Sequence, residues 1–228
     1  MPVAVKICCI AGVDEARLAI SAGASALGLV SAMPSGPGVI TDDTAAEVAA
    51  AVAAGRCGTP VRTFLLTART RAAEIAAQHR QVGTTTLQLV DHVPAGELQA
   101  LRGLCPGIEI VQVIHVAGEH ALAEAAAAAP WVDALLLDSG NPTLAVKELG
   151  GTGRTHDWAL SARICQAAHP LPLWLAGGLR AGNVTEAVQR VAPHGVDLCS
   201  GVRRDGRLDA ALLADFMAAV GARTAAPL

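Results

Sequence analysis

Short apolar runs alternate along the whole chain with segments in which apolar residues recur every three or four positions. The apolar runs predict eight strands, at residues 3–9, 26–30, 61–66, 85–90, 108–115, 132–138, 171–176 and 196–199. The segments that follow them predict eight helices, at residues 13–22, 41–53, 69–79, 96–102, 119–129, 157–168, 183–192 and 208–220. Most of the runs are continuously apolar rather than alternating, which is typical of parallel strands covered by helices.

Eight strand–helix units in 228 residues match the lower end of the size range of a (β/α)8 TIM barrel. An open, doubly wound parallel sheet is the structural alternative. No linker, low-complexity segment or shift in composition marks a second domain. We therefore expect a single α/β barrel domain over residues 1–220 and a frayed C-terminal tail at residues 221–228.

Composition narrows the possible functions. The chain is 52% hydrophobic, only 16% charged, and carries a formal net charge of -3, so it has material for a large core and no long-range attraction for nucleic acid. No apolar run reaches about 18 residues, and no basic leader precedes the first strand, so we expect neither membrane insertion nor export. The six cysteines form no C-x-x-C pair, which disfavours a disulfide framework or a zinc site and favours the cytoplasm.

In such a barrel the active site lies at the C-terminal ends of the strands. At the end of the first strand, the period of two places Lys6 and Cys8 on one face, opposite Ile7 and Cys9. If that face points inward, an ammonium group lies one layer below a thiol and favours the thiolate. The alternative is that Cys8 only fills space in the core.

Asp138 ends the sixth strand after three leucines. Desolvation there would raise the pKa of its carboxyl group and let it donate a proton near neutral pH. Capping of the following turn is the alternative role. A thiolate base and a carboxylic acid at one barrel mouth suit an acid–base isomerisation.

Glycines cluster after the last three strands, at residues 150–153, 177–178 and 200–201. Glycine lets backbone N–H groups approach an anion, and the loops after strands seven and eight are the usual phosphate site of a barrel. Ordinary turns would explain one of these clusters but not all three. The predicted phosphate-binding residues are Gly151, Gly153, Gly177, Gly178, Ser200 and Gly201.

With these residues in place, the chain resembles the phosphoribosylanthranilate isomerase family of tryptophan biosynthesis, from the first strand to the last helix. The shared motifs are V-K-I-C at residues 5–8, G-A-S-A-L-G at 23–28, Q-L at 88–89, L-L-D at 136–138, G-G-T-G-R-T-H-D-W at 150–158, L-A-G-G-L at 175–179 with N-V at 183–184, G-V-D at 195–197 and S-G-V at 200–202.

The resemblance implies that Cys8 is the general base and Asp138 the general acid of an Amadori rearrangement, in which an aldosamine becomes an aminoketose. It implies a small phosphorylated substrate, no metal, no organic cofactor, and a monomer or homodimer. The substrate-binding residues that we expect from it are Lys6, Gln88, Lys147, Arg154 and Asp197.

Several positions depart from the family pattern. The family's second loop reads S-P-R, and its arginine reaches the anthranilate carboxylate, whereas residues 35–38 read S-G-P-G. Cys9 stands where the family has glycine, residues 88–91 read Q-L-V-D in place of Q-L-H-G, and Gln112 and His115 fall about where the family often has lysine and arginine. The loop between Asp138 and Gly150 is also several residues longer.

Two interpretations follow from these departures. Lys147 or Arg154 replaces the missing arginine and anthranilate remains the substrate, although a lysine would lose the bidentate fork. Alternatively, the pocket serves another phosphosugar derivative, either as an isomerase or as a binding module without turnover.

Overall fold

The computed structural model describes residues 2–59, 61–140, 144, 147, 149 and 153–221. Its eight principal strands are β1 (Ala4–Ile7), β2 (Ala26–Val30), β3 (Arg62–Thr67), β4 (Thr86–Leu89), β5 (Glu109–His115), β6 (Ala134–Asp138), β7 (Leu173–Leu175) and β8 (Gly195–Leu198). Every adjacent pair is parallel, and β8 pairs with β1, so the sheet closes into a barrel. The predicted (β/α)8 barrel is confirmed, and the open doubly wound sheet is excluded.

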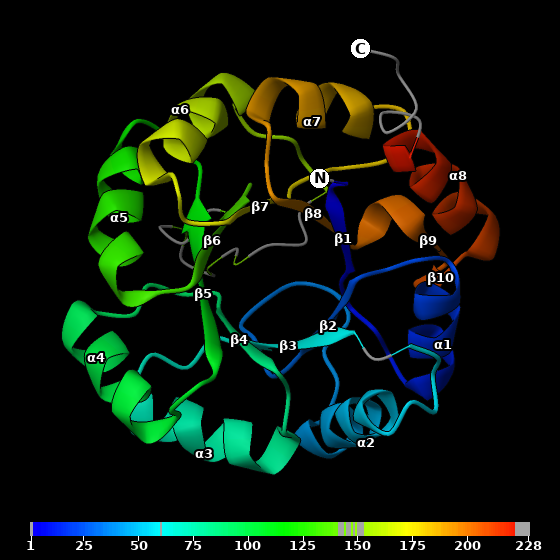
Figure 1. Ribbon diagram of the computed structural model, residues 1–228, viewed down its shortest axis with the longest axis horizontal. Coiled ribbons are helices and arrows are strands. Elements are labelled where there is room, and N and C mark those ends of the chain that lie inside the picture. The colour runs from blue at the N-terminus through cyan, green and yellow to red at the C-terminus, as the bar shows by residue number, and fades with distance from the viewer. Residues whose placement is uncertain are drawn as a thin grey trace.

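In the described residues, eight α-helices surround the strands (Figure 1). They are α1 (Val13–Ser21), α2 (Asp42–Ala53), α3 (Ala72–Val82), α4 (Ala95–Leu104), α5 (His120–Ala128), α6 (Trp158–Ala168), α7 (Val184–Val191) and α8 (Ala210–Gly221). The predicted tail beyond Gly221 lies outside the described residues. Within the part of the chain that the structure describes, no helix is both long and apolar enough to cross a membrane.

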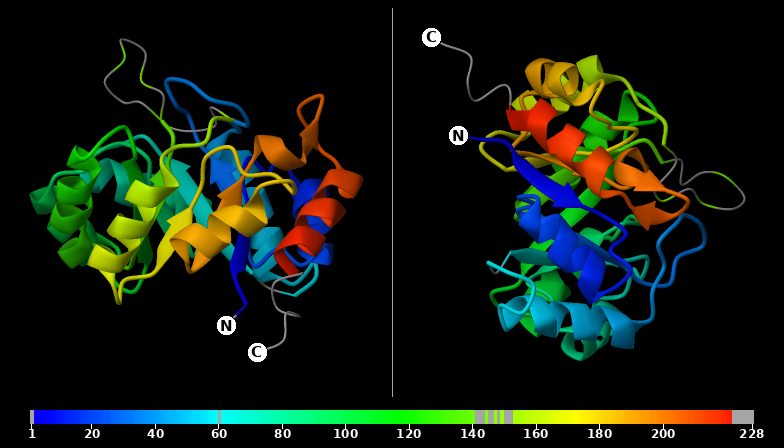
Figure 2. Two further views of the ribbon diagram at one scale, coloured as in Figure 1. Left: turned by 90° about the horizontal axis from the view of Figure 1, so that it is seen from above. Right: turned by 90° about the vertical axis from the view of Figure 1, so that its right-hand side faces the viewer.

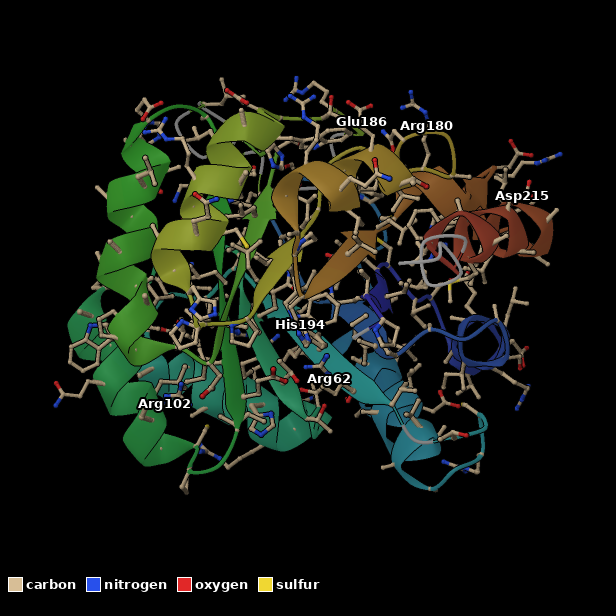
Figure 3. The ribbon with its side chains drawn as sticks, turned by 45° about the horizontal axis from the view of Figure 1, so that its top comes forward. Arg62, Arg102, Arg180, Glu186, His194 and Asp215 are labelled. Carbon is tan, nitrogen blue, oxygen red and sulfur yellow. The ribbon has the colours of Figure 1, made fainter. Side chains whose placement is uncertain are left out.

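Alternate strand residues fill two separate layers of the core. Those pointing outward, such as Ile7 and Leu65, join the cluster between strands and helices, whereas Phe64 and Trp174 belong to the cluster inside the barrel. The inner rings of Phe64 and Trp174 meet edge to face at 5.6 Å, and the Arg62 guanidinium lies 5.0 Å from the Trp174 ring. Figure 3 labels Arg62, which begins β3. Side chains therefore fill the inside of the barrel around Phe64 and Trp174.

Capping side chains set two of the helix starts. Thr41 accepts a hydrogen bond from the N–H of Thr44, and Asp157 accepts from those of Ala159 and Leu160. Each satisfies donors of the first helical turn. The third predicted helix was placed three residues too early, because α3 begins at Ala72 and continues to a left-handed Gly83.

A short hairpin occupies the predicted start of the closing helix. Residue 208 was expected to begin that helix, but Arg207–Leu208 (β10) pairs with Arg203–Arg204 (β9) in an antiparallel ribbon. The helix starts only at Ala210, after Asp209 accepts N–H groups from Ala211 and Leu212. The β9–β10 hairpin and the loop after β2 rise on the same side of the barrel, opposite the start of β1 (Figure 2, left).

Candidate active site

A cavity opens at the C-terminal ends of the strands. The predicted site residues among its lining are Cys8, Gln88, Asp138, Gly153, Gly177, Gly178, Asp197 and Ser200. Side chains from β4, β6 and β8, and Cys8 directly after β1, thus meet in one space, as the sequence predicts. Gly151 lies outside the described residues.

Cys8 directly follows β1 and is held there by its N–H, which donates to the Leu198 carbonyl at 2.9 Å. Gly28 on the neighbouring strand makes room for its thiol: a Cβ at Gly28 would lie 2.9 Å from Cys8 Sγ and 3.1 Å from Lys6 Nζ. The thiol and the ammonium group therefore share one small space, on the same face of β1. The predicted placement of Lys6 below Cys8 is confirmed.

Lys6 is fully buried and forms an ion pair with Asp197, its Nζ lying 2.9 Å from Oδ2. Burial disfavours the charged ammonium, but the Asp197 carboxylate and the Cys8 sulfur outweigh that effect, so the pKa of Lys6 is raised. Lys6 is therefore a fixed positive charge beneath the cavity.

Asp138 ends β6 and points into the same cavity. Burial raises the pKa of its carboxyl group, and the nearby Asp197 adds to that effect. Three groups act in the other direction: the Ser139 N–H, which donates to Oδ1 at 2.7 Å, and the nearby side chains of His115 and Lys6, which lower this pKa electrostatically. The net direction is upward, which favours the protonated form that a general acid needs.

Cys9 was expected to face away from the cavity with Ile7, and that prediction is wrong. Cys9 lines the cavity together with Cys8 and Cys199. The reason is that β1 ends at Ile7 and Cys9 adopts a left-handed conformation with φ of 64°, so the strand alternation stops. Its thiol hydrogen bonds to Cys199, which lowers the pKa of Cys199 and raises that of Cys9.

The described glycines of the three clusters lie on chain segments that touch one another. A Cβ at Gly178 would lie 2.7 Å from the carbonyl carbon of Arg154, and one at Gly201 would lie 2.0 Å from the Leu179 oxygen. A Cβ at Gly153 would lie 3.6 Å from Ser200 Oγ. The segments after β6, β7 and β8 are therefore close enough to contact one ligand, as the spacing of the glycines predicts.

Gln88 lies in the cavity wall and is 3% exposed, and its Oε1 has no hydrogen-bond partner. Asp197 Oδ1 is in the same situation at the other side of the cavity. Unsatisfied buried acceptors are costly unless a ligand supplies donors. These two oxygens are suited to bind hydroxyl groups.

Lys147 and Arg154 are not among the described residues that line the cavity. Lys147 Nζ lies 2.5 Å from Asp91 Oδ2, and the Lys147 carbonyl accepts a hydrogen bond from Ser35 Oγ at 2.6 Å. These contacts connect the loops after β2, β4 and β6. Arg154 is exposed, and its backbone packs against Gly178.

Two residues near the site were missed in the sequence. His156 lies beside Gly177, where a Cβ would be 3.0 Å from its Nδ1, and burial lowers the pKa of His156 to about 4. Arg203 donates to the carbonyls of Cys8 and Cys9. A polar residue after the S-G-V motif was a signal for Arg203, but its partner carbonyls 194 and 195 positions earlier have no sequence signature.

Comparisons with known proteins agree with this architecture. A family model described as N-(5'phosphoribosyl)anthranilate (PRA) isomerase matches residues 9–219. The N-(5'-phosphoribosyl)anthranilate isomerase of Nostoc punctiforme is 37% identical over 202 residues, covering 88% of this chain and 89% of the relative. That of Haloferax volcanii is 37% identical over 204 residues, covering 89% and 85%. The solved phosphoribosyl anthranilate isomerase of Thermococcus kodakaraensis superposes with a TM-score of 0.74 at 27% identity, over 96% of this chain and 99% of that one.

Proposed function

The chain belongs to the N-(5'-phosphoribosyl)anthranilate isomerase family, and from that membership we propose that Cys8 and Asp138 are the acid–base pair of its reaction. The protein is an aldose–ketose isomerase that converts N-(5'-phosphoribosyl)anthranilate into the corresponding 1-deoxyribulose phosphate. The observation that carries the residue assignment is that Cys8, directly after β1, and Asp138, at the end of β6, line one cavity.

In the first step, Asp138 gives its proton to the ribose ring oxygen as the C1′–O bond breaks, which leaves an open-chain iminium ion and an Asp138 carboxylate. Cys8 then takes the proton from C2′, and the C2′–H electron pair forms the C1′–C2′ double bond while the iminium electrons return to nitrogen. Tautomerisation of this enolamine gives the aminoketose. The raised pKa of Asp138 supports its role as proton donor. The Cys8 thiol lies beside the Lys6 ammonium group and lines the cavity, which supports its role as the group that takes the proton.

The substrate phosphate rests on the three joined glycine segments. Gly153, Gly177 and Gly178 have φ of 68°, 85° and 60°, which turns their peptide units in ways that most side chains would hinder. Such turns form concave groups of N–H donors for anions. We assign the part of the cavity near Met33, on the loop after β2, to the anthranilate ring.

A specific observation favours a second candidate, turnover of a phosphoribosyl amine without a carboxylate on its aglycone. No lysine or arginine is among the described residues of the cavity lining, and Lys147 is paired with Asp91. Comparing kcat/KM for phosphoribosylanthranilate and for the matching aniline derivative separates the two. A preference above about ten-fold for the carboxylate supports anthranilate, because a lost charged contact is worth that much.

The residue assignment is tested by the loss of substrate fluorescence with purified enzyme. Cys8→Ala should lower kcat by about 10²-fold or more, since a general base contributes that much. The matched control is Cys57→Ala, which removes a buried thiol that hydrogen bonds to the Val13 carbonyl, away from the cavity lining. Equal activity in the two variants would reject Cys8 as the base.

We further propose a cytoplasmic enzyme that acts as a monomer or homodimer. The described cysteines are all unpaired thiols, which fits a reducing compartment. Sedimentation velocity at micromolar concentration distinguishes the two assembly states.

A further inference from the structure

Arg203 binds the backbone of the turn that carries the base. Its Nη2 donates to the Cys9 carbonyl at 2.5 Å and to the Cys8 carbonyl at 3.3 Å. The side chain is only 9% exposed, and Arg203 is not among the described residues that line the cavity. It therefore holds the turn from behind, on the side away from the substrate.

Glu15 fixes the guanidinium in this orientation. Its two carboxylate oxygens pair with Arg203 at 2.9 and 3.1 Å, and they also accept N–H groups from Ala11 at 3.1 Å and Leu208 at 3.0 Å. Burial opposes ionisation of Glu15, but Arg203 and these N–H groups outweigh it, so its pKa is lowered. The pair joins the turn after β1 to the β9–β10 hairpin through bidentate, charge-assisted hydrogen bonds.

The loop after β2 confines the same turn from the other side. A Cβ at Gly38 would lie 2.4 Å from Cys9 Cβ, so the two backbones are in direct contact. Cys9 has φ of 64°, a conformation that a non-glycine residue keeps only where its surroundings impose it. Arg203 and Gly38 together supply those surroundings.

We propose that Arg203, oriented by Glu15, is a positioning residue that fixes the Cys8–Cys9 peptide and thereby aims the Cys8 thiol at the substrate. This inference rests on the proposed role of Cys8 as base. Neither side chain touches the substrate, so the pair acts on kcat rather than on substrate binding. A displacement of about 1 Å at a reacting group costs up to about 10²-fold in rate.

The test is Arg203→Met, measured by steady-state kinetics and by the rate at which iodoacetamide alkylates Cys8, followed by peptide mass spectrometry. We expect kcat to fall about ten-fold or more, KM to change less than three-fold, and the Cys8 alkylation rate to change with kcat. Arg203→Lys should keep one carbonyl contact, so its kcat and Cys8 alkylation rate should lie between those of wild type and Arg203→Met. Glu15→Gln should change both quantities in the same direction as Arg203→Met, by a smaller factor.

Arg102 provides the matched control. Like Arg203, it donates to two backbone carbonyls, those of Trp131 and Ile108 at 3.2 Å each, and it pairs with the Asp133 carboxylate at 2.8 Å. Unlike Arg203, it lies at the N-terminal end of the barrel. Figure 3 shows Arg102 on the opposite side of the molecule from α8, which carries Asp215. Arg102→Met should leave kcat and Cys8 alkylation within two-fold of wild type, even where it lowers the melting temperature as much as Arg203→Met does.

Two outcomes would overturn the inference: Arg203→Met and Arg203→Lys both keeping kcat and Cys8 alkylation within two-fold, or Arg102→Met reproducing their effects. The failure of the proposed function has a different signature, namely full activity of Cys8→Ala. In that case a changed alkylation rate in Arg203→Met would still show that Arg203 positions the thiol. Should Arg203→Met not fold, Arg203→Lys and Glu15→Gln carry the same measurements.

Discussion

Lys6 and Asp197 form a buried ion pair across the seam that closes the barrel. They are direct neighbours in the register of β1 and β8, and their charged groups lie 2.9 Å apart. The pair lies next to Cys8, so one interaction joins the first strand to the last and also places a positive charge beneath the proposed base.

Removing one member of this pair should cost more stability than removing both. Lys6→Met leaves the Asp197 carboxylate buried without a counter-ion, and we expect the free energy of unfolding to fall by about 3–5 kcal/mol. The double variant Lys6→Met/Asp197→Leu should recover at least about 2 kcal/mol of that loss, because apolar replacements remove both desolvated charges. Urea unfolding of the two single variants and the double variant gives the coupling energy, and strictly additive effects would contradict this prediction.

Asp138→Asn should make the enzyme inactive and more stable at neutral pH. Burial raises the pKa of Asp138 in the folded protein above its value in the unfolded chain, so the folded state holds the proton more tightly. Stability is therefore lost as the pH rises from the unfolded pKa toward the folded pKa. The asparagine keeps an acceptor for the Ser139 N–H but has no proton to lose, so it avoids this cost.

The measurement is the difference in melting temperature between Asp138→Asn and wild type at several pH values. It should be small near pH 4 and grow as the pH rises, while kcat falls at least about 10²-fold at every pH. In wild type, kcat/KM should decline on the alkaline side as Asp138 loses its proton. A variant less stable than wild type at pH 8 would disprove the assigned direction of the pKa shift.

Much of the fold was predictable because a parallel barrel repeats a simple pattern. Most strands are continuous apolar runs and the helices follow a 3.6-residue period, so all eight units were recognised. The predicted strand ends also named loops that line the cavity. The observed helix boundaries differ from the predicted ones where local contacts outweigh the hydrophobic pattern. Residues 207–208 pair with β9 instead of starting a helix, and α3 continues until Gly83 ends it.

The part of the candidate site that the sequence did not predict depends on backbone conformation and on contacts between residues far apart in the chain. The alternation of side chains placed Cys9 outward, and only its left-handed φ brings it into the cavity. Arg203 and Glu15 are 188 residues apart and meet because the barrel closes. Neither a conformation at one residue nor such a pairing can be read from hydrophobic periodicity.

Gly38→Ala should disturb the base through the backbone alone. The new methyl group would lie 2.4 Å from Cys9 Cβ, and Gly38 has φ of 76°, so both overlap and backbone strain oppose the change. We expect a loss of about 2 kcal/mol or more in unfolding free energy and a lower kcat. Gly103→Ala is the control, because that glycine is exposed in α4 with nothing within 4 Å, and alanine there should stabilise the helix by about 0.5 kcal/mol without changing kcat. Equal effects of the two substitutions would refute this account.

The Lys147–Asp91 ion pair connects the loops after β4 and β6 beside the cavity. Ser35 hydrogen bonds to the Lys147 carbonyl, so Ser35, Asp91 and Lys147 form a bridge between three loops, which we call the strap. Lys147 is not among the described residues of the cavity lining. If the strap acts by holding the loops together, Lys147→Ala and Asp91→Ala remove the same interaction. We then expect each variant to raise KM by a similar factor, about two- to ten-fold, and the double variant to be no worse than either single one.

The predicted role of Lys147 in binding the substrate carboxylate gives the opposite result. Asp91→Ala would free the ammonium group for the substrate and lower KM, whereas Lys147→Ala would raise it, and the preference for anthranilate over the aniline derivative would fall only in Lys147→Ala. Because the 2.5 Å contact already neutralises Lys147 at the rim, we expect the symmetric result, with the aniline preference unchanged in both variants. Opposite changes in KM would instead assign the missing arginine's function to Lys147.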